Sequence, residues 1–118
     1  EALALENGIE LRVTVTPCKL ARDRASGIGL LINEVVTNAV KHAFKGRESG
    51  IIAISLTADE TEAVVSIEDN GIGLPEDIRD GAQGRLFLNA FAATAKAELD
   101  CQSSSAGTRY IATLRELP

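Results

Sequence analysis

Two kinds of hydrophobic periodicity follow one another in the first half of the chain, and together they constrain the fold most. Over residues 9–15 apolar and polar side chains alternate before Pro17, which is typical of a strand with one buried face. From about residue 23 to residue 44 the spacing becomes helical, and Gly46 offers a plausible end. The apolar side chains on one side of this helix are Ile28, Leu31, Ile32, Val35, Ala39 and Ala43. This pattern predicts a long helix packed on a sheet.

Two hairpins are predicted in the second half of the chain. Residues 51–58 and 63–69 are rich in β-branched side chains and flank a polar turn. Residues 97–103 and 108–114 flank a turn rich in Ser and Gly. Connections of hairpin length argue against a doubly wound parallel sheet, because parallel pairs need long crossovers.

A second helix is expected between the hairpins, over residues 85–94. Gly81 and Gly84 would break the chain before it. Its buried stripe is expected to consist of Leu86, Phe87, Ala90 and Phe91. The order of elements favours the α+β class, as a two-layer α/β sandwich whose mixed, mostly antiparallel sheet carries helices on one face. Residues 9–118 would form this domain, and residues 1–8 would be the end of an upstream helix or linker.

Composition and charge exclude several kinds of function. The chain has 118 residues, 45% of them apolar and 25% charged, as expected for one globular domain. A net charge of -5 and an aromatic content of 3% disfavour a nucleic-acid partner. The sequence shows no apolar run of about 20 residues and no signal-peptide pattern, so we expect a cytoplasmic location without membrane contact. Because Met is absent, we expect a domain of a longer protein. Cys18 and Cys101 have no metal-binding or thiol-redox spacing.

A polar stripe runs along the first helix, away from its apolar side. At about 100° per residue, Asn38 and Lys41 fall within roughly 40° of Glu34, and His42 within roughly 80°. A solvated face would account for such a stripe. However, Asn and Thr are poor helix formers in mid-helix, and a solvated face would more naturally use Glu, Lys, Gln or Arg. A ligand-binding face is therefore the second interpretation.

Glycines and an aspartate follow the strand that ends at residue 69. Asp69 can accept hydrogen bonds from an amino group of a ligand, and Gly71 and Gly73 permit close approach of the backbone to a ring or phosphate. The same stretch could equally be a tight turn. Gly84 precedes a predicted helix start, where free N–H groups can hold phosphate, and Thr108 opens the last strand after a predicted hairpin turn.

Taken together and in this order, these motifs resemble a known family. The run N-E-V-V-T-N-A-V-K-H-A-F at residues 33–44 resembles the N box of the GHKL ATPase superfamily, and specifically that of sensor histidine kinases. The run D-N-G-I-G-L at residues 69–74 resembles the first glycine box. With the short segment that follows, the chain looks most like the HWE group of bacterial kinases, and its fold would be the Bergerat ATP-binding fold.

For the helix, the resemblance implies four roles. Asn38 would coordinate a Mg²⁺ ion that bridges the phosphates of ATP, and Lys41 would contact a phosphate. Glu34 matches the acidic catalytic position, which orients or deprotonates a nucleophile in hydrolytic members. His42 belongs to the same motif and is counted with the nucleotide-binding residues.

For the loops, the resemblance implies contacts with the nucleotide. Asp69 would bind the exocyclic amino group of adenine, Gly71 and Gly73 would permit its close approach, and Thr108 would support the base. Gly84 corresponds to the second glycine box. Here the spacing is looser than in the family, and the Gly-Gly expected after the helix is replaced by residues 94–97.

The resemblance also implies an activity and partners. The γ-phosphoryl of ATP would pass to a histidine on a separate dimerisation domain, and then to the receiver domain of a response regulator. Two alternatives stay open. The altered second glycine box would fit a degenerate domain that binds a response regulator without nucleotide. An anti-sigma-factor Ser/Thr kinase would have the same ATP-binding fold.

Overall fold

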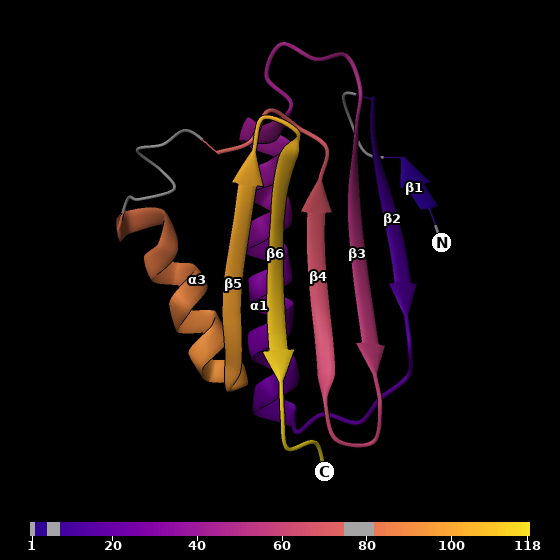
Figure 1. Ribbon diagram of the computed structural model, residues 1–118, viewed down its shortest axis with the longest axis vertical. Helices are drawn as coiled ribbons and strands as arrows, with labels where there is room; N and C mark the ends of the chain where they lie inside the picture. The colour runs from indigo at the N-terminus through magenta and orange to yellow at the C-terminus, as the bar shows by residue number, and fades with distance from the viewer. Residues whose placement is uncertain (1, 5–7, 75–81) are drawn as a thin grey trace.

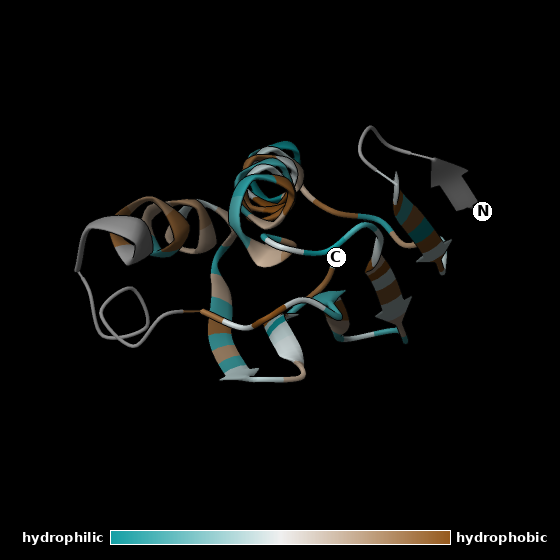
Figure 2. Cartoon of the chain, turned by 90° about the horizontal axis from the view of Figure 1, so that it is seen from above, coloured by the Kyte–Doolittle hydropathy of each residue, from teal (hydrophilic) through white to brown (hydrophobic). Residues whose placement is uncertain are grey.

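The computed structural model describes residues 2–4, 8–74 and 82–118, which form two layers. One layer is a six-stranded sheet with the order β1-β2-β3-β4-β6-β5. Its strands are β1 (Ala2–Ala4), β2 (Ile9–Val15), β3 (Gly50–Ala58), β4 (Ala63–Asp69), β5 (Ala97–Ser104) and β6 (Gly107–Leu114). The other layer holds α1 (Arg22–Asn38), the π-helix η2 (Ala39–Ala43) that continues it, and α3 (Ala82–Ala95). These helices lie on one face of the sheet (Figure 1, Figure 2).

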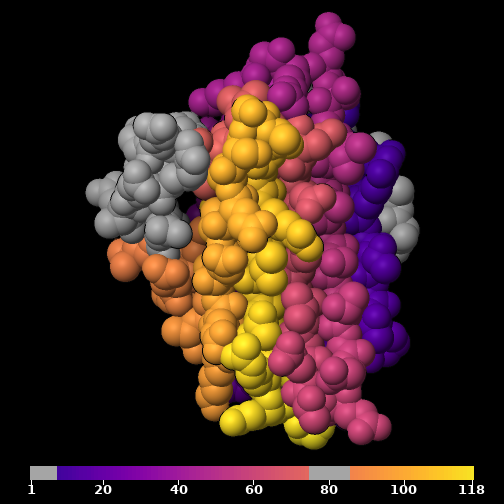
Figure 3. Space-filling view, viewed as in Figure 1, coloured from indigo at the N-terminus to yellow at the C-terminus, as the bar shows by residue number. Residues whose placement is uncertain are grey.

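The sheet is mixed. Among the neighbouring pairs of described strands, β2 and β3 run parallel and the other four pairs are antiparallel. The parallel pair is connected through α1 and η2, because parallel strands need a crossover. The predicted α+β sandwich with a mostly antiparallel sheet and helices on one face is confirmed. The opposite face of the sheet faces the viewer in Figure 3, and no helix of the described chain covers it.

The first strand differs from the expectation for the N-terminal segment. The sequence led us to expect the end of a helix or a linker over residues 1–8, whereas Ala2–Ala4 forms β1 and pairs antiparallel with β2. A strand of three residues is too short for alternation to be recognised in a sequence. Gly8 adopts a φ of 73° immediately before β2, a conformation that glycine accommodates without strain.

The core lies between α1 and the middle of the sheet. The predicted apolar stripe of the helix is buried except for Ile32, which is half-buried, and it packs on side chains from β3, β4 and β6. Gly27 sets the distance between α1 and α3, because a Cβ there would lie 2.5 Å from the backbone nitrogen of Ala95. The buried side chains shared by the two layers include Ile28, Leu31, Val35, Ile52, Val65, Ile67, Ala112 and Leu114.

The second helix buries a different stripe from the one predicted. It begins at Ala82, so Gly84 lies inside α3 instead of before it, and Gly81 lies outside the described residues. Of the predicted stripe, Leu86 and Phe87 are 66% and 59% exposed and Ala90 is also exposed, whereas Phe91 is half-buried and packs against the core. The fully buried side chains in the described part of this helix are Leu88, Ala92 and Ala95. The residues of this helix are apolar on nearly every side, so periodicity could not select the buried face. None of the described helices is long and apolar enough to cross a membrane.

Candidate functional site

Asp69 is the last residue of β4, and the main chain fixes its carboxylate. Oδ1 accepts a hydrogen bond from the backbone N–H of Gly71 at 2.8 Å and another from that of Thr108 at 3.3 Å. Thr108 is the register partner of Asp69 on β6. No hydrogen bond reaches Oδ2 within the described part of the chain, so this oxygen can accept one from a ligand.

Burial raises the pKa of Asp69 above its ordinary value of 3.8. The hydrogen bonds from Gly71 and Thr108 oppose this shift, as does the positive charge of Arg47, while the neighbouring Glu68 adds to it. Taking a carboxylate out of water disfavours its charged form. When it is ionised, Asp69 can only accept hydrogen bonds, so it selects a ligand that presents a donor.

The two glycines after Asp69 are required by the protein's own backbone. A Cβ on Gly71 would lie 2.2 Å from the carbonyl oxygen of Ala43, at the end of η2. Gly73 has a φ of 83°, and a Cβ there would lie 2.0 Å from the carbonyl oxygen of Ser104. The loop is thus pressed between η2 and β5. Direct contact of these glycines with a nucleotide stays a prediction.

Ser103 is a further residue of this cluster, which the sequence analysis missed. Its hydroxyl lies 2.9 Å from that of Thr108 and accepts a hydrogen bond from the backbone N–H of Leu74 at 2.8 Å. Thr108 itself is only 5% exposed. Ser103 could have been found only through its pairing with Thr108 across the β5–β6 ladder. Ser103, which is hydrogen-bonded to Thr108, thus attaches Leu74 in the loop after β4 to strand β5.

On the helix, Glu34 and Asn38 form a second cluster. The amide nitrogen of Asn38 donates a hydrogen bond to Oε1 of Glu34 at 3.3 Å. A carboxylate can only accept, so this bond requires the nitrogen, and not the oxygen, of the amide to face Glu34. The amide oxygen of Asn38 is therefore directed elsewhere and could bind a cation. Both side chains are half-buried.

Lys41 and His42 lie in η2 and are exposed. The positions predicted for them assumed about 100° of rotation per residue, as in an α-helix. A π-helix rotates less per residue, so the angles calculated for an α-helix do not apply to these two side chains. Single π-turns occur frequently at functional sites.

The helix cluster and the strand cluster are joined through the loop after β4. The backbone N–H of Ile72 donates to the carbonyl of Ala43 at 2.8 Å, which attaches this loop to the end of η2. Figure 1 shows η2, the loop after β4 and the β5–β6 turn at the same end of the molecule. A cavity of about 290 Å³ opens there, and Asp69, Ser103 and Thr108 line it while Glu34 and Asn38 do not.

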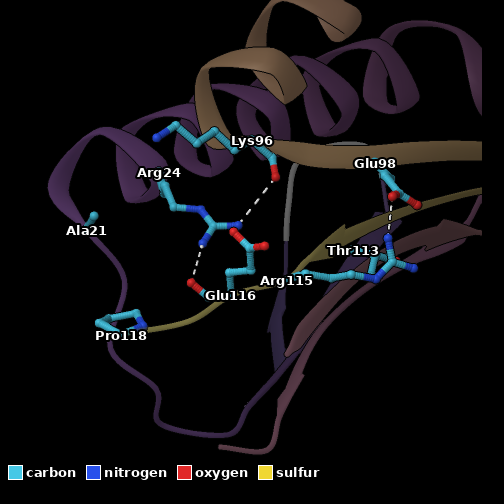
Figure 4. A pocket seen from close by; sticks show the side chains of 8 residues that line it. All are labelled: Ala21, Arg24, Lys96, Glu98, Thr113, Arg115, Glu116 and Pro118. Carbon is cyan, nitrogen blue, oxygen red and sulfur yellow. Dashed lines mark hydrogen bonds and ion pairs between the residues drawn. The ribbon is translucent and has the colours of Figure 1, made fainter. Parts of the chain in front are cut away.

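A cavity of about 500 Å³ lies beside Arg24, Lys96 and the C-terminal residues (Figure 4). Arg24 is buried, and its guanidinium donates to the carbonyl oxygens of Ala95 at 2.9 Å, Lys96 at 3.3 Å and Glu116 at 3.4 Å. Ala95 is the last residue of α3 and Lys96 follows it, and a positive charge is favourable at this end of a helix. Arg24 thus caps α3, and this explains its burial without a ligand.

Comparison with known proteins gives concordant results. The family model of histidine kinase-, DNA gyrase B-, and HSP90-like ATPases matches residues 23–116. Blue-light-activated histidine kinase 2 of Erythrobacter litoralis is 33% identical over 104 residues, which are 85% of this chain and 30% of that protein. The solved histidine kinase domain of the Erythrobacter litoralis EL346 blue-light activated histidine kinase superimposes with a TM-score of 0.83 at 29% identity, over 94% of this chain and 53% of that one.

A shorter similarity links the chain to another kind of protein. An anti-sigma F factor of Clostridium botulinum is 38% identical over 56 residues, which are 48% of this chain and 38% of that protein. The chain therefore spans less than half the length of either curated relative.

Proposed function

The chain belongs to the family of histidine kinase-, DNA gyrase B-, and HSP90-like ATPases, and we propose that it is the ATP-binding catalytic domain of a two-component sensor histidine kinase. The family implies that the domain binds ATP. The observation that carries the nucleotide-binding part of the proposal is the orientation of Asp69, whose Oδ1 is held by two backbone N–H groups while Oδ2 is left for a ligand. The match of 85% of this chain to blue-light-activated histidine kinase 2 supports the histidine kinase part. The exocyclic amino group of adenine supplies the donor that this oxygen requires.

The residues of α1 fit a magnesium ion. Mg²⁺ prefers oxygen ligands and is usually held by few protein groups together with substrate phosphates. The amide oxygen of Asn38 is such a ligand, and the hydrogen bond to Glu34 fixes its orientation. When bound, Mg²⁺ would neutralise the negative charge of the phosphates. Lys41 is exposed on η2 and would add a second positive charge near the phosphates.

Glu34 would act on the nucleophile. Its Oε1 accepts the hydrogen bond from Asn38, which holds the carboxylate beside the proposed metal ligand. From this position it would orient the attacking group for in-line transfer, a reaction catalysed mostly by positioning and electrostatics.

The phosphoacceptor would lie on another domain. His42 is the only histidine of this chain and belongs to the nucleotide-binding motif. The γ-phosphoryl of ATP would therefore pass to a histidine of the dimerisation and phosphoacceptor domain, and from there to an aspartate of a response regulator receiver domain. The use of ATP agrees with the cytoplasmic location expected from the sequence.

An anti-sigma-factor Ser/Thr kinase is the second candidate, because an anti-sigma F factor matches 48% of the chain. The two functions differ in the phosphorylated product. Phosphohistidine is lost in acid and survives alkali, whereas phosphoserine survives acid.

The test is phosphorylation of the full-length protein with γ-labelled ATP and Mg²⁺. The proposal predicts an acid-labile label that then passes to a receiver domain. Glu34→Gln should reduce labelling by about tenfold or more while it leaves ATP binding intact. An acid-stable label on a serine or threonine of a second protein would favour the anti-sigma-factor kinase. Absence of both labelling and ATP binding would favour a degenerate domain that binds a response regulator.

A further inference from the structure

Arg47 is placed over the loop after β4 by a tight turn at the end of η2. The backbone N–H of Arg47 donates to the carbonyl of Phe44 at 3.0 Å, and Gly46 turns the chain with a φ of 77°. From this turn the guanidinium Nη1 of Arg47 donates a hydrogen bond to the backbone carbonyl of Asn70. A residue that follows the helix thus reaches the residue next to Asp69.

Asn70 fixes the start of the loop to β3. Its side-chain Oδ1 accepts a hydrogen bond from the backbone N–H of Ile51 at 2.8 Å, and its own N–H donates to the carbonyl of Ile51 at 3.2 Å. Asn70 thereby extends the β3–β4 ladder beyond its last pair, Ile52 with Asp69. The carbonyl group that accepts the hydrogen bond from Arg47 belongs to Asn70, the residue directly before Gly71 in the loop after β4.

Two hydrogen bonds therefore hold residues 70–72 of the loop, one at each end. Arg47 holds the carbonyl of Asn70, and the backbone N–H of Ile72 donates to Ala43. Gly71 lies between these two contacts, and its N–H is one of the two donors that orient Asp69. Loss of the contact at Asn70 would let Gly71 shift, and the carboxylate of Asp69 would then lose a donor.

We propose that Arg47 is a positioning residue of the nucleotide site, which ties the chain after η2 to the carbonyl of Asn70 and thereby holds the Asp69 carboxylate in the orientation that accepts the amino group of adenine. This inference rests on the proposed function. Arg47 acts through Asn70 and Gly71 and does not touch the ligand. Burial raises the pKa of Asp69, and the charge of Arg47 opposes this shift, which favours the ionised form that accepts hydrogen bonds.

The test compares adenosine and ATP as ligands of the full-length protein and its variants by calorimetric titration. Arg47→Met keeps most of the aliphatic stem and removes the charge and the donors. This variant should bind adenosine and ATP more weakly than the wild type by the same factor, about five- to tenfold. Arg47→Lys restores a charged donor and should recover most of this loss. Arg12→Met is the matched control on β2, where Arg12 is exposed and paired with Glu10, and it should bind as the wild type does.

Each other outcome identifies what is wrong. If Arg47→Met weakens the binding of ATP and leaves the binding of adenosine unchanged, Arg47 contacts the phosphates, and the positioning role is overturned. Wild-type affinity in Arg47→Met, or no recovery in Arg47→Lys, would overturn it as well while the proposed function stands. If the wild type binds neither ligand, the proposed function fails and this inference fails with it. A thermal unfolding midpoint close to that of the wild type shows that the variants are folded.

Discussion

The Oδ1 atom of Asp69 accepts a hydrogen bond from the backbone N–H of Thr108 at 3.3 Å, across the ladder between β4 and β6. The same oxygen accepts a second bond from the N–H of Gly71. Both donors are main-chain groups, so the orientation of the carboxylate depends on the strand register and on the conformation of the loop after β4. The site is therefore built by the sheet before any ligand arrives.

Asp69→Asn should separate stability from binding. Because burial raises the pKa of Asp69 above 3.8, the ionised form costs stability, and the cost is present at pH values above the raised pKa. The Asn variant should thus unfold at a higher temperature than the wild type near neutral pH, and this advantage should vanish as the pH falls below about 4. ATP affinity should drop by about ten- to a hundredfold, because the hydrogen bond to a charged acceptor is lost.

Thermal unfolding from about pH 3 to about pH 8 and calorimetric titration check this prediction. An Asn variant that is less stable than the wild type at neutral pH would contradict the burial argument. An Asn variant that binds ATP normally would contradict the role of Asp69.

Gly71→Ala should destabilise the domain and impair nucleotide binding. The added Cβ would lie 2.2 Å from the carbonyl oxygen of Ala43, so the loop or the end of η2 must move. We expect a loss of about 1–3 kcal/mol in the free energy of unfolding, measured by denaturant titration. Gly29→Ala is the matched control on α1, since nothing lies within 4 Å of its added Cβ. Gly29→Ala should raise the free energy of unfolding by up to about 1 kcal/mol. Equal effects of the two substitutions on the free energy of unfolding would refute the close-packing argument.

Arg24→Met should affect stability without affecting nucleotide binding. It leaves the carbonyls of Ala95, Lys96 and Glu116 without their guanidinium donor. We expect the free energy of unfolding to fall by about 2–3 kcal/mol, while ATP affinity is unchanged in the folded protein. The exposed Arg22 on the same helix is the control, and Arg22→Met should change stability by less than about 0.5 kcal/mol. Similar stabilities of the two variants would show that the capping of α3 by Arg24 contributes little.

Removal of magnesium should affect the wild type more than Asn38→Ala. If the amide oxygen of Asn38 binds the ion, chelation with EDTA should weaken ATP binding to the wild type by about tenfold or more. In Asn38→Ala the affinity should already be low, and chelation should change it little. Adenosine binding should be the same in both proteins, because no phosphate is present. Asn33→Ala, at an exposed position of the same helix, should retain the full magnesium effect, and its loss there would argue against a specific role of Asn38.

The sequence predicts most of the fold because alternation and helical spacing are strong signals where one face of an element is polar. This holds for β2, for the β3–β4 hairpin and for α1, whose buried stripe is confirmed. It fails for α3, where Leu86 and Phe87 are as apolar as the side chains that are buried. It also fails for β1, where three residues carry too little pattern.

The site is predictable only as far as its motifs are local. The motifs single out Asp69 and Thr108, and the structure places them opposite each other on β4 and β6, a pairing that the sequence analysis did not predict. Arg47 was missed because its contact with Asn70 depends on how distant segments are packed. Ser103 could have been found only through its pairing with Thr108 in the β5–β6 hairpin, because its contact with Leu74 also joins distant segments. The π-turn that carries Lys41 could not be predicted either, for a different reason. Nothing in the local sequence indicates that the helix changes to a π-turn after Asn38.

The most direct test of the central claim is calorimetric titration of the full-length protein with ATP and with GTP in the presence of Mg²⁺. Adenine presents an amino donor at the position where guanine presents a carbonyl acceptor, and the ionised Asp69 can pair only with the donor. We predict that ATP binds, that GTP binds at least about tenfold more weakly, and that Asp69→Asn removes this preference. Equal affinity for both nucleotides, or no binding of ATP by the folded protein, would contradict the account.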